Sequence, residues 1–122
     1  MAIVGDPINE RVTSFYTTTL TDQDGVVIPA ANLTTLTLTF YNRDSLAIIN
    51  GRNAQPVLNI NNVTIHATSG LLTWTMQPAD NLIVDPTCAY EEHVLLFEWT
   101  LNNGNVGKHE ASVLVKNLNK VS

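Results

Sequence analysis

The stretch 32–52, NLTTLTLTFYNRDSLAIINGR, carries the clearest strand pattern in the chain. Leu36, Leu38 and Phe40 alternate with threonine and tyrosine, so one face of the stretch is apolar and the other is polar. A period of two in β-branched and aromatic residues predicts a half-buried strand over residues 34–42. The polar residues NRDS follow, and residues 46–50 are expected to return beside this strand as its hairpin partner.

Strand patterns recur on both sides of this stretch. Residues 11–22 alternate in the same way, and the turn DQDG follows them. Residues 62–67 and 70–76 predict a hairpin that bends at Ser69 and Gly70, and NNGN predicts another between residues 90–101 and 106–118.

Two segments have no clear strand period. Residues 53–59 are ambiguous and could hold one helical turn, whereas residues 77–89 contain two prolines and predict a crossover with a short helical turn. No longer helix is predicted. The fold class expected from these patterns is all-β: an antiparallel immunoglobulin-like β-sandwich of about seven to eight strands. It would form one domain over residues 14–122, preceded by an N-terminal arm over residues 1–13.

The closing hairpin allows a prediction of strand register. A two-residue turn within NNGN would scatter the apolar residues of both strands over the two faces of the sheet. Placing Phe97 opposite Ala111 and Trp99 opposite His109 makes one face almost wholly apolar, so burial favours this pairing. This pairing requires a bulge or an odd-length loop near the turn, which the glycines there permit.

Composition excludes several classes of partner. The chain has 122 residues, a formal net charge of −5 and only six Lys and Arg residues, which argues against nucleic-acid binding. It contains no apolar run long enough to cross a membrane and no signal-peptide pattern, so no membrane partner and synthesis in a reducing cytoplasm are expected. Only 14% of the residues are charged, and the abundant threonine and asparagine suit packing against other proteins.

Metal-binding patterns are incomplete. Asp22 and Asp24 resemble the start of a calcium loop, but the residues that follow do not supply the remaining ligands at the required spacing. His66, His93 and His109 share no spacing typical of a zinc site. The sequence therefore predicts no metal and no cofactor.

Catalytic patterns are equally weak. The single cysteine, Cys88, has no glycine motif of the oxyanion type near it, and Asp80 and Asp85 are explained by helix capping and turn formation. Trp74 and Trp99 alternate in phase with leucine and phenylalanine, which favours core positions over a carbohydrate platform. An enzyme is not expected, and no catalytic residue is predicted.

A resemblance adds a functional expectation. The strings TLTDQDGVVIP, NLTTLTLTFYN, IINGRNAQPVLN, GLLTWTMQPADNLIVD, HVLLFEWT and GKHEASVLVKNL resemble small immunoglobulin-like virion proteins of tailed bacteriophages, over nearly the whole chain from about Ser14 to Leu118. The resemblance implies a non-enzymatic virion protein, made in the host bacterial cytoplasm. It would decorate or cement the capsid or the head–tail junction in multiple copies.

The implied partners are the major capsid protein or other virion proteins, in a homo-oligomer or a multicopy assembly. An alternative stays open: a tail, baseplate or receptor module of the same fold that binds glycan, for which Tyr41, Tyr90 and Arg52 would matter most. The motifs are turns and core positions, so they indicate a fold group and carry no catalytic residues.

The contact surface is expected to combine the N-terminal segment before Ser14, the hairpin region 43–52 and the crossover 77–89. The N-terminal segment is too apolar to remain in water, and such termini often add to a sheet edge of a neighbour. The crossover carries an apolar run without a period that would bury all of it. The candidate partner-binding residues are Ile3, Val4, Ile8, Arg43, Arg52, Leu82 and Ile83.

Overall fold

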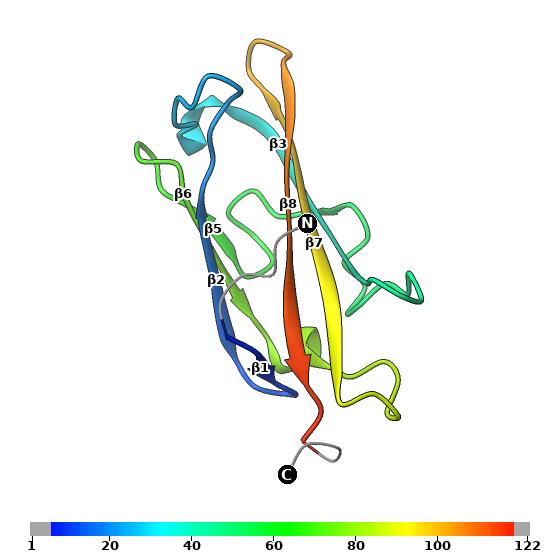
Figure 1. Ribbon diagram of the computed structural model, residues 1–122. Coiled ribbons are helices and arrows are strands. Elements are labelled where there is room, and N and C mark those ends of the chain that lie inside the picture. The colour runs from blue at the N-terminus through cyan, green and yellow to red at the C-terminus, as the bar shows by residue number, and fades with distance from the viewer. Residues whose placement is uncertain (1–5, 119–122) are drawn as a thin grey trace.

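The computed structural model describes residues 6–118, which form β-strands and two short 3-10 helices (Figure 1). The expected all-β class is confirmed. In the described part of the chain, no helix is long and apolar enough to span a membrane. The elements are β1 (Ile8–Asn9), β2 (Ser14–Thr19), η1 (Ala30–Asn32), β3 (Leu33–Asn42), β4 (Gln55–Pro56), β5 (Val63–Ile65), β6 (Leu71–Met76), η2 (Pro78–Asn81), β7 (Tyr90–Leu101) and β8 (Val106–Lys116).

The strands form two sheets that lie as two layers (Figure 1). One sheet has five strands in the order β1-β8-β7-β3-β4, and the other has three in the order β2-β6-β5. Neighbouring strands are antiparallel, except that β1 runs parallel to β8. This arrangement is consistent with a β-sandwich whose core lies between the sheets.

The core is built from the apolar positions that alternate along the strands. Trp74 and Trp99 are both buried, as the alternation predicts. The rings of Phe40 and Trp74 meet edge to face at a centroid distance of 4.9 Å, a favoured aromatic geometry. The fully buried large apolar side chains from β3, β6 and β7 are Leu36, Leu38, Phe40, Leu72, Trp74, Met76, Leu95 and Phe97.

The segment after β3 returns differently from the expected hairpin. Residues 46–50 form no strand: an isolated bridge between Tyr41 and Ile48 and a few backbone hydrogen bonds join them to β3. Leu46 and Asn50 adopt positive φ angles of 63° and 53°, which interrupt an extended strand.

The ambiguous segment 53–59 supplies the edge strand β4 and shows no helical turn. The hairpin of β5 with β6 and the short helical turn in residues 77–89 are as predicted.

The predicted register of the last hairpin is wrong by two residues. Phe97 lies opposite His109, and Trp99 lies opposite Gly107. A shift of two residues leaves every side chain on its expected face, so the apolar face is the predicted one. The cause is a tertiary contact: a Cβ atom at Gly107 would lie 2.6 Å from the Trp99 Nε1 atom, so the indole requires glycine as its cross-strand neighbour.

The loop of this hairpin has the odd length that was predicted. Residues 102–104 form it, and the amide of Leu101 donates to the carbonyl of Asn105 over 2.7 Å. Gly104 adopts a φ of +88°, which is the left-handed residue expected at the end of a three-residue loop. The register also sets Glu98 opposite Lys108, where the expected register placed two glutamates together.

Part of the predicted N-terminal arm belongs to the domain. Ile8 and Asn9 pair in parallel with Val115 and Lys116 of β8, and Ile8 packs against the core. A short apolar segment thus covers a sheet edge of its own chain, which satisfies the same edge hydrogen bonds that a neighbour would. Ile3 and Val4, also predicted as contact residues, lie outside the described residues.

Candidate binding surface

One end of the sandwich brings together three segments that are far apart in sequence. The amide of Glu10 donates to the carbonyl of Lys116 over 3.0 Å, and that of Arg11 donates to Asn81 over 2.8 Å. The amide of Asn117 donates to the carbonyl of Ala89, also over 2.8 Å. Residues 8–12, the crossover 77–89 and the end of β8 therefore form a single surface where β7 begins.

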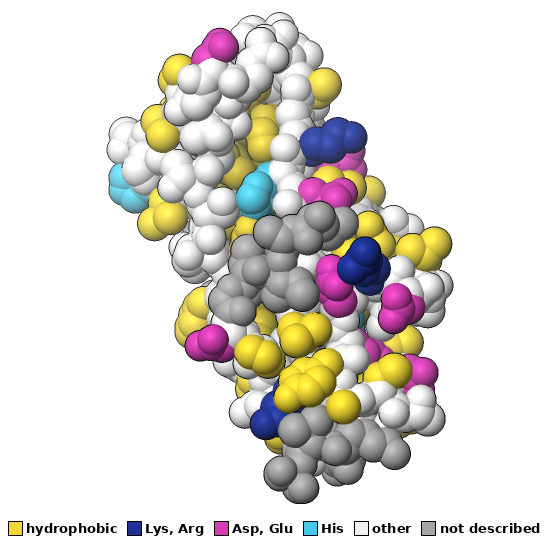
Figure 2. Space-filling model, viewed as in Figure 1, with side chains coloured by type: hydrophobic (Ala, Val, Ile, Leu, Met, Phe, Trp, Pro, Cys, Tyr) yellow, Lys and Arg dark blue, Asp and Glu magenta, His cyan; other side chains and the backbone are white. Residues whose placement is uncertain are grey.

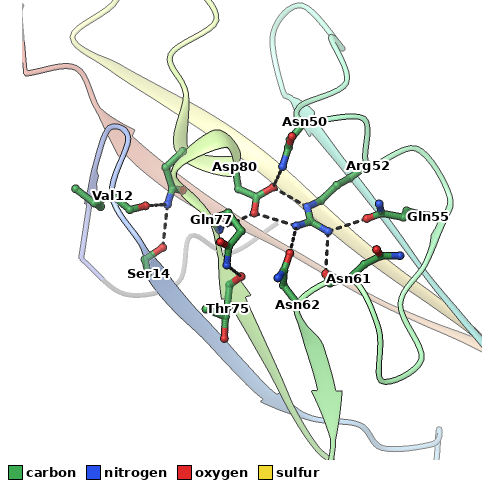
Figure 3. Close-up of polar contacts among 11 residues, drawn as sticks. Val12, Ser14, Asn50, Arg52, Gln55, Asn61, Asn62, Thr75, Gln77 and Asp80 are labelled. Carbon is green, nitrogen blue, oxygen red and sulfur yellow. Dashed lines mark hydrogen bonds and ion pairs between the residues drawn. The ribbon is translucent and has the colours of Figure 1, made fainter.

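Buried amide side chains fix this end of the molecule. Asn81 is fully buried, and its Nδ2 donates to the carbonyl of Val12 over 2.8 Å and to the hydroxyl of Ser14 over 3.0 Å (Figure 3). The Nδ2 of Asn117 donates to the carbonyls of Pro86 and Cys88 over 3.1 and 2.9 Å. These side-chain hydrogen bonds hold the irregular backbone of the crossover, a task that backbone hydrogen bonds perform within a sheet.

Four of the predicted contact residues lie toward this end of the sandwich. Ile8 is half-buried beside β8, while Leu82 is exposed and Ile83 half-buried in the crossover. Arg43 follows β3, where its amide donates to the carbonyl of Glu92 over 3.0 Å. Its exposed guanidinium pairs with the Glu92 carboxylate over 2.8 Å.

Other apolar side chains extend the patch beyond the predicted residues. Leu82, Val84, Tyr90 and Leu118 are between 39% and 47% exposed. Hydrophobic side chains gather over the lower half of the face in Figure 2. The apolar run of the crossover indicates Val84 already in the sequence, but nothing in the sequence places Leu118 at the same end of the molecule. We call this patch the basal surface and define it as Ile8, Arg43, Leu82, Ile83, Val84, Tyr90 and Leu118.

Arg52 does not belong to any exposed surface, which corrects the prediction for this residue. It is 2% exposed and lies between the sheets, with its guanidinium carbon 5.2 Å from the ring centroid of Trp74. Its Nε and Nη2 donate to the two carboxylate oxygens of Asp80 over 2.6 and 3.0 Å (Figure 3). A buried guanidinium needs such a bidentate partner, because an unpaired buried charge is costly.

Asp80 connects this ion pair to the crossover. The amide of Gln77 donates to Asp80 Oδ2 over 2.7 Å and so begins η2, and Asn50 donates to Oδ1 over 3.0 Å. Arg52 also donates to the side chain of Gln55 over 2.7 Å. The pair therefore ties the loop after β3 to the start of the crossover. The capping role predicted for Asp80 is confirmed, but its pairing with Arg52, 28 residues away, was not visible in the sequence.

A second buried pair holds the other half of the crossover. Glu91 Oε1 accepts from the amide of Val84 over 2.8 Å, and Oε2 accepts from that of Asp85 over 2.5 Å. His93 Nε2 lies 2.8 Å from Glu91 Oε1. Burial alone would raise the pKa of Glu91, but the hydrogen bonds from Val84, His93 and Asp85 outweigh it and lower the pKa. Burial lowers the pKa of His93 despite the nearby carboxylate.

These pKa shifts predict that the protein loses stability in acid. The folded state holds His93 neutral and Glu91 ionised, so it binds fewer protons than the unfolded chain, and stability rises with pH. Burial lowers the pKa of His109 in the same direction. We expect the melting temperature to fall as the pH drops below about 6.5, the pKa of an unperturbed histidine, and to fall further below about 4.3, where carboxylates protonate.

Thermal unfolding between pH 7 and pH 4 measures this effect. Replacing His93 by Gln should remove part of the decline just below pH 6.5. A wild-type melting temperature that stays constant down to pH 4 would contradict the proposed roles of both buried groups.

Comparisons with known proteins supply no relative for this chain. No family model, no curated protein and no solved structure matches it. The fold and the surface define an all-β protein of two sheets with an apolar patch at one end. Any function assigned to the chain rests on its own residues and their geometry.

Proposed function

We propose that the chain is a non-enzymatic structural protein of a tailed-phage virion, bound in multiple copies to the capsid or to the head–tail junction. The observation that carries this proposal is the basal surface. Four residues expected to contact a partner come from three separate segments and lie toward one end of the sandwich. Exposed Val84, Tyr90 and Leu118 add to the same patch.

The strand order supports the immunoglobulin-like assignment within this proposal. Immunoglobulin-like sandwiches place strands B, E and D in one sheet and G, F and C in the other, with C′ added in variable-type domains. Strands β2, β6 and β5 take the first three places, and β8, β7, β3 and β4 take the other four. The order along the chain also agrees. The chain departs from antibody domains in having one cysteine, so the disulfide between strands B and F is missing.

The chemistry of the patch suits a protein partner. Leucine, isoleucine, valine and tyrosine dominate it, and interface cores are depleted in charge and enriched in aromatic residues. Arg43 and its partner Glu92 lie at the rim, where an exposed ion pair contributes little affinity. Binding to the capsid or another virion protein should therefore depend only weakly on salt.

The use of the buried ionisable groups also favours a structural role. Arg52 is held by Asp80, and Glu91 is held by His93 and by two backbone amides of the crossover. Each of these groups fixes the loops that shape the basal surface. These groups therefore position the loops of a contact surface. This use of them supports a structural protein that binds a partner by surface complementarity.

A charged substitution in the basal surface tests the proposal. Replacing Val84 by Asp puts a carboxylate into an apolar contact, and we expect at least a tenfold loss of incorporation into phage particles, about 1.4 kcal/mol per contact. Quantitative mass spectrometry of purified particles measures the copy number. The matched control is Val26→Asp, because Val26 is exposed on the turn at the opposite end of the sandwich.

Both variants should melt within a few degrees of the wild type, since both side chains are exposed in the isolated chain. Normal incorporation of the Val84 variant, or equal loss with the Val26 variant, would show that the basal surface is not the contact.

A further inference from the structure

Strand β2 forms one edge of the smaller sheet, and half of its backbone groups point away from that sheet (Figure 1). The amide of Leu20 donates to the carbonyl of Gly70, its opposite residue in the register of β2 with β6, over 3.0 Å. Bonded and non-bonded positions alternate in an antiparallel pair, so the even-numbered residues of β2 bond to β6. Phe15, Thr17 and Thr19 therefore point their N–H and C=O groups outward, where no described residue bonds to them.

The edges of the other described strands are closed in ways that prevent pairing with another chain. β4 has two residues, one of them Pro56. The outward amides of β5 are used by the loop before it: Val63 donates to the carbonyl of Ile60 over 3.2 Å, and Ile65 donates to the Asn59 side chain over 2.8 Å. The edge of β8 pairs with β1 at its end and carries charged side chains along its length. β2 contains neither proline nor a charged residue, so its edge is the open one among the described strands.

There is room for another strand beside this edge. A hollow of about 480 Å³ lies between β2 and β8, and Phe15, Thr17, Met76 and His109 are among the residues that line it. The hydroxyl oxygen of Tyr16 lies 2.5 Å from His109 Nε2, and this contact ties β2 to β8 of the larger sheet. A partner strand would therefore meet an edge that is already held in place, and binding would not have to order it.

We propose that β2 pairs with β2 of a second copy of this chain, antiparallel and across a two-fold axis. The smaller sheets of the two molecules then form one continuous sheet. The outward positions determine the register, because only these positions can exchange hydrogen bonds across the edge. Thr17 lies opposite Thr17 of the partner subunit, and Phe15 lies opposite Thr19 of the partner subunit. Each of these pairs, and the pair that the two-fold axis generates from the second, exchanges two backbone hydrogen bonds.

A second copy is the favoured occupant because β2 is complementary to itself in this register. On the outer face of the sheet, Phe15 meets threonine and Thr17 meets threonine, and both are favourable cross-strand pairs. Each copy has a formal net charge of −5, yet β2 brings no charged side chain to the contact. A symmetric pair also closes two open edges at once, which a different protein would do only with an edge of its own.

The inference does not depend on the virion role. The basal surface is defined by residues of other segments, and β2 contributes none of them. Pairing through β2 is tested with the purified chain in solution, whereas the basal surface is tested by incorporation into particles. Failure of either proposal therefore leaves the other standing.

Sedimentation equilibrium of the purified chain, from micromolar to millimolar concentration, tests the proposal. We expect a reversible equilibrium between monomer and dimer. In amide hydrogen exchange, the protection of Phe15, Thr17 and Thr19 should rise with protein concentration, because pairing occupies their amides. A chain that stays monomeric up to millimolar concentration overturns the proposal. Protection of these amides that does not depend on concentration also overturns it, since the chain would then cover its own edge.

Substitutions of Thr17, the residue on the two-fold axis, separate pairing from folding. Thr17→Lys places two ammonium groups opposite each other and should weaken dimerisation by about tenfold or more. Thr64→Lys, at an exposed threonine of β5, is the matched control and should dimerise as the wild type does. Thr17→Pro removes an amide that β6 does not use and should prevent dimerisation, whereas Thr17→Val keeps the amide and should preserve it. Dimers that survive both Thr17→Lys and Thr17→Pro would show that the contact lies elsewhere.

A disulfide reports the register directly. In a Cys88→Ser background, Thr17→Cys places two thiols at a pair whose Cα atoms are about 5.5 Å apart, a separation that a disulfide can bridge. Mild oxidation should therefore give covalent dimers of this variant. Thr64→Cys in the same background should remain monomeric under denaturing conditions. Cross-linking through position 64 in place of position 17 would overturn the proposed pairing.

Discussion

Replacing Arg52 by Ala is expected to lower the free energy of unfolding by about 3–5 kcal/mol. The substitution leaves the carboxylate of Asp80 fully buried without its cation, and the cost of an uncompensated buried charge sets this magnitude. Gln55, which also accepts a hydrogen bond from Arg52, loses that partner as well. Domains of this size are stable by about 5–15 kcal/mol, so the variant would retain only a small part of its stability. Urea unfolding at pH 7 measures the change.

Arg43 provides the matched control for this prediction. It is the other arginine with an acidic partner, but its side chain is 60% exposed, so Arg43→Ala should cost no more than about 1 kcal/mol. Replacing both members of the buried pair, as Arg52→Met with Asp80→Leu, should recover part of the loss, because no charge remains unpaired. Equal effects of the Arg52 and Arg43 substitutions would show that the buried pair does not hold the loop after β3 to η2.

Replacing Phe97 by Ala is expected to cost a similar 3–5 kcal/mol, for a different reason. The Phe97 ring is fully buried and lies 6.2 Å from the ring of Trp74 and 6.4 Å from that of Tyr16, between centroids. Its removal forfeits the burial of a large side chain and leaves a cavity between the two sheets. Thermal and urea unfolding should both show the loss.

Phe15 is the control of the same residue type. It is 69% exposed on β2, and Phe15→Ala should change the stability by less than about 0.5 kcal/mol. A Phe97→Ala variant that unfolds like the wild type would mean that the core is not formed between the sheets as described.

Local patterns predicted the strands because each strand has one buried face. The alternation through Leu36, Leu38 and Phe40, and through Leu72, Trp74 and Met76, reports which side chains enter the core, and all six are buried. A period of two fixes the face but not the pairing partner, which is why the register of the last hairpin was missed while its faces were correct. The deciding contact, Trp99 over Gly107, exists only once both strands are placed.

The candidate contact surface could be predicted only in part. The apolar excess of the crossover is visible in the sequence and indicated Leu82 and Ile83 as candidate contacts, of which Leu82 is exposed and Ile83 half-buried. The role of Arg52 was not visible, because its partner Asp80 lies on another segment and exposed and buried arginines look alike in a sequence. The proximity of two turns was not visible either: DQDG and NNGN each predict a turn, but their closeness depends on the packing of the two sheets.

The most direct test of the proposed virion role is a reconstruction, at side-chain resolution, of the particles of the phage whose genome encodes this chain. The proposal predicts many copies on the capsid or at the head–tail junction. In each copy, Leu82, Val84 and Tyr90 would lie against the neighbouring virion protein, and the hairpin of β7 with β8 would point away from it. Attachment through that hairpin, or particles that lack the chain altogether, would contradict the proposal.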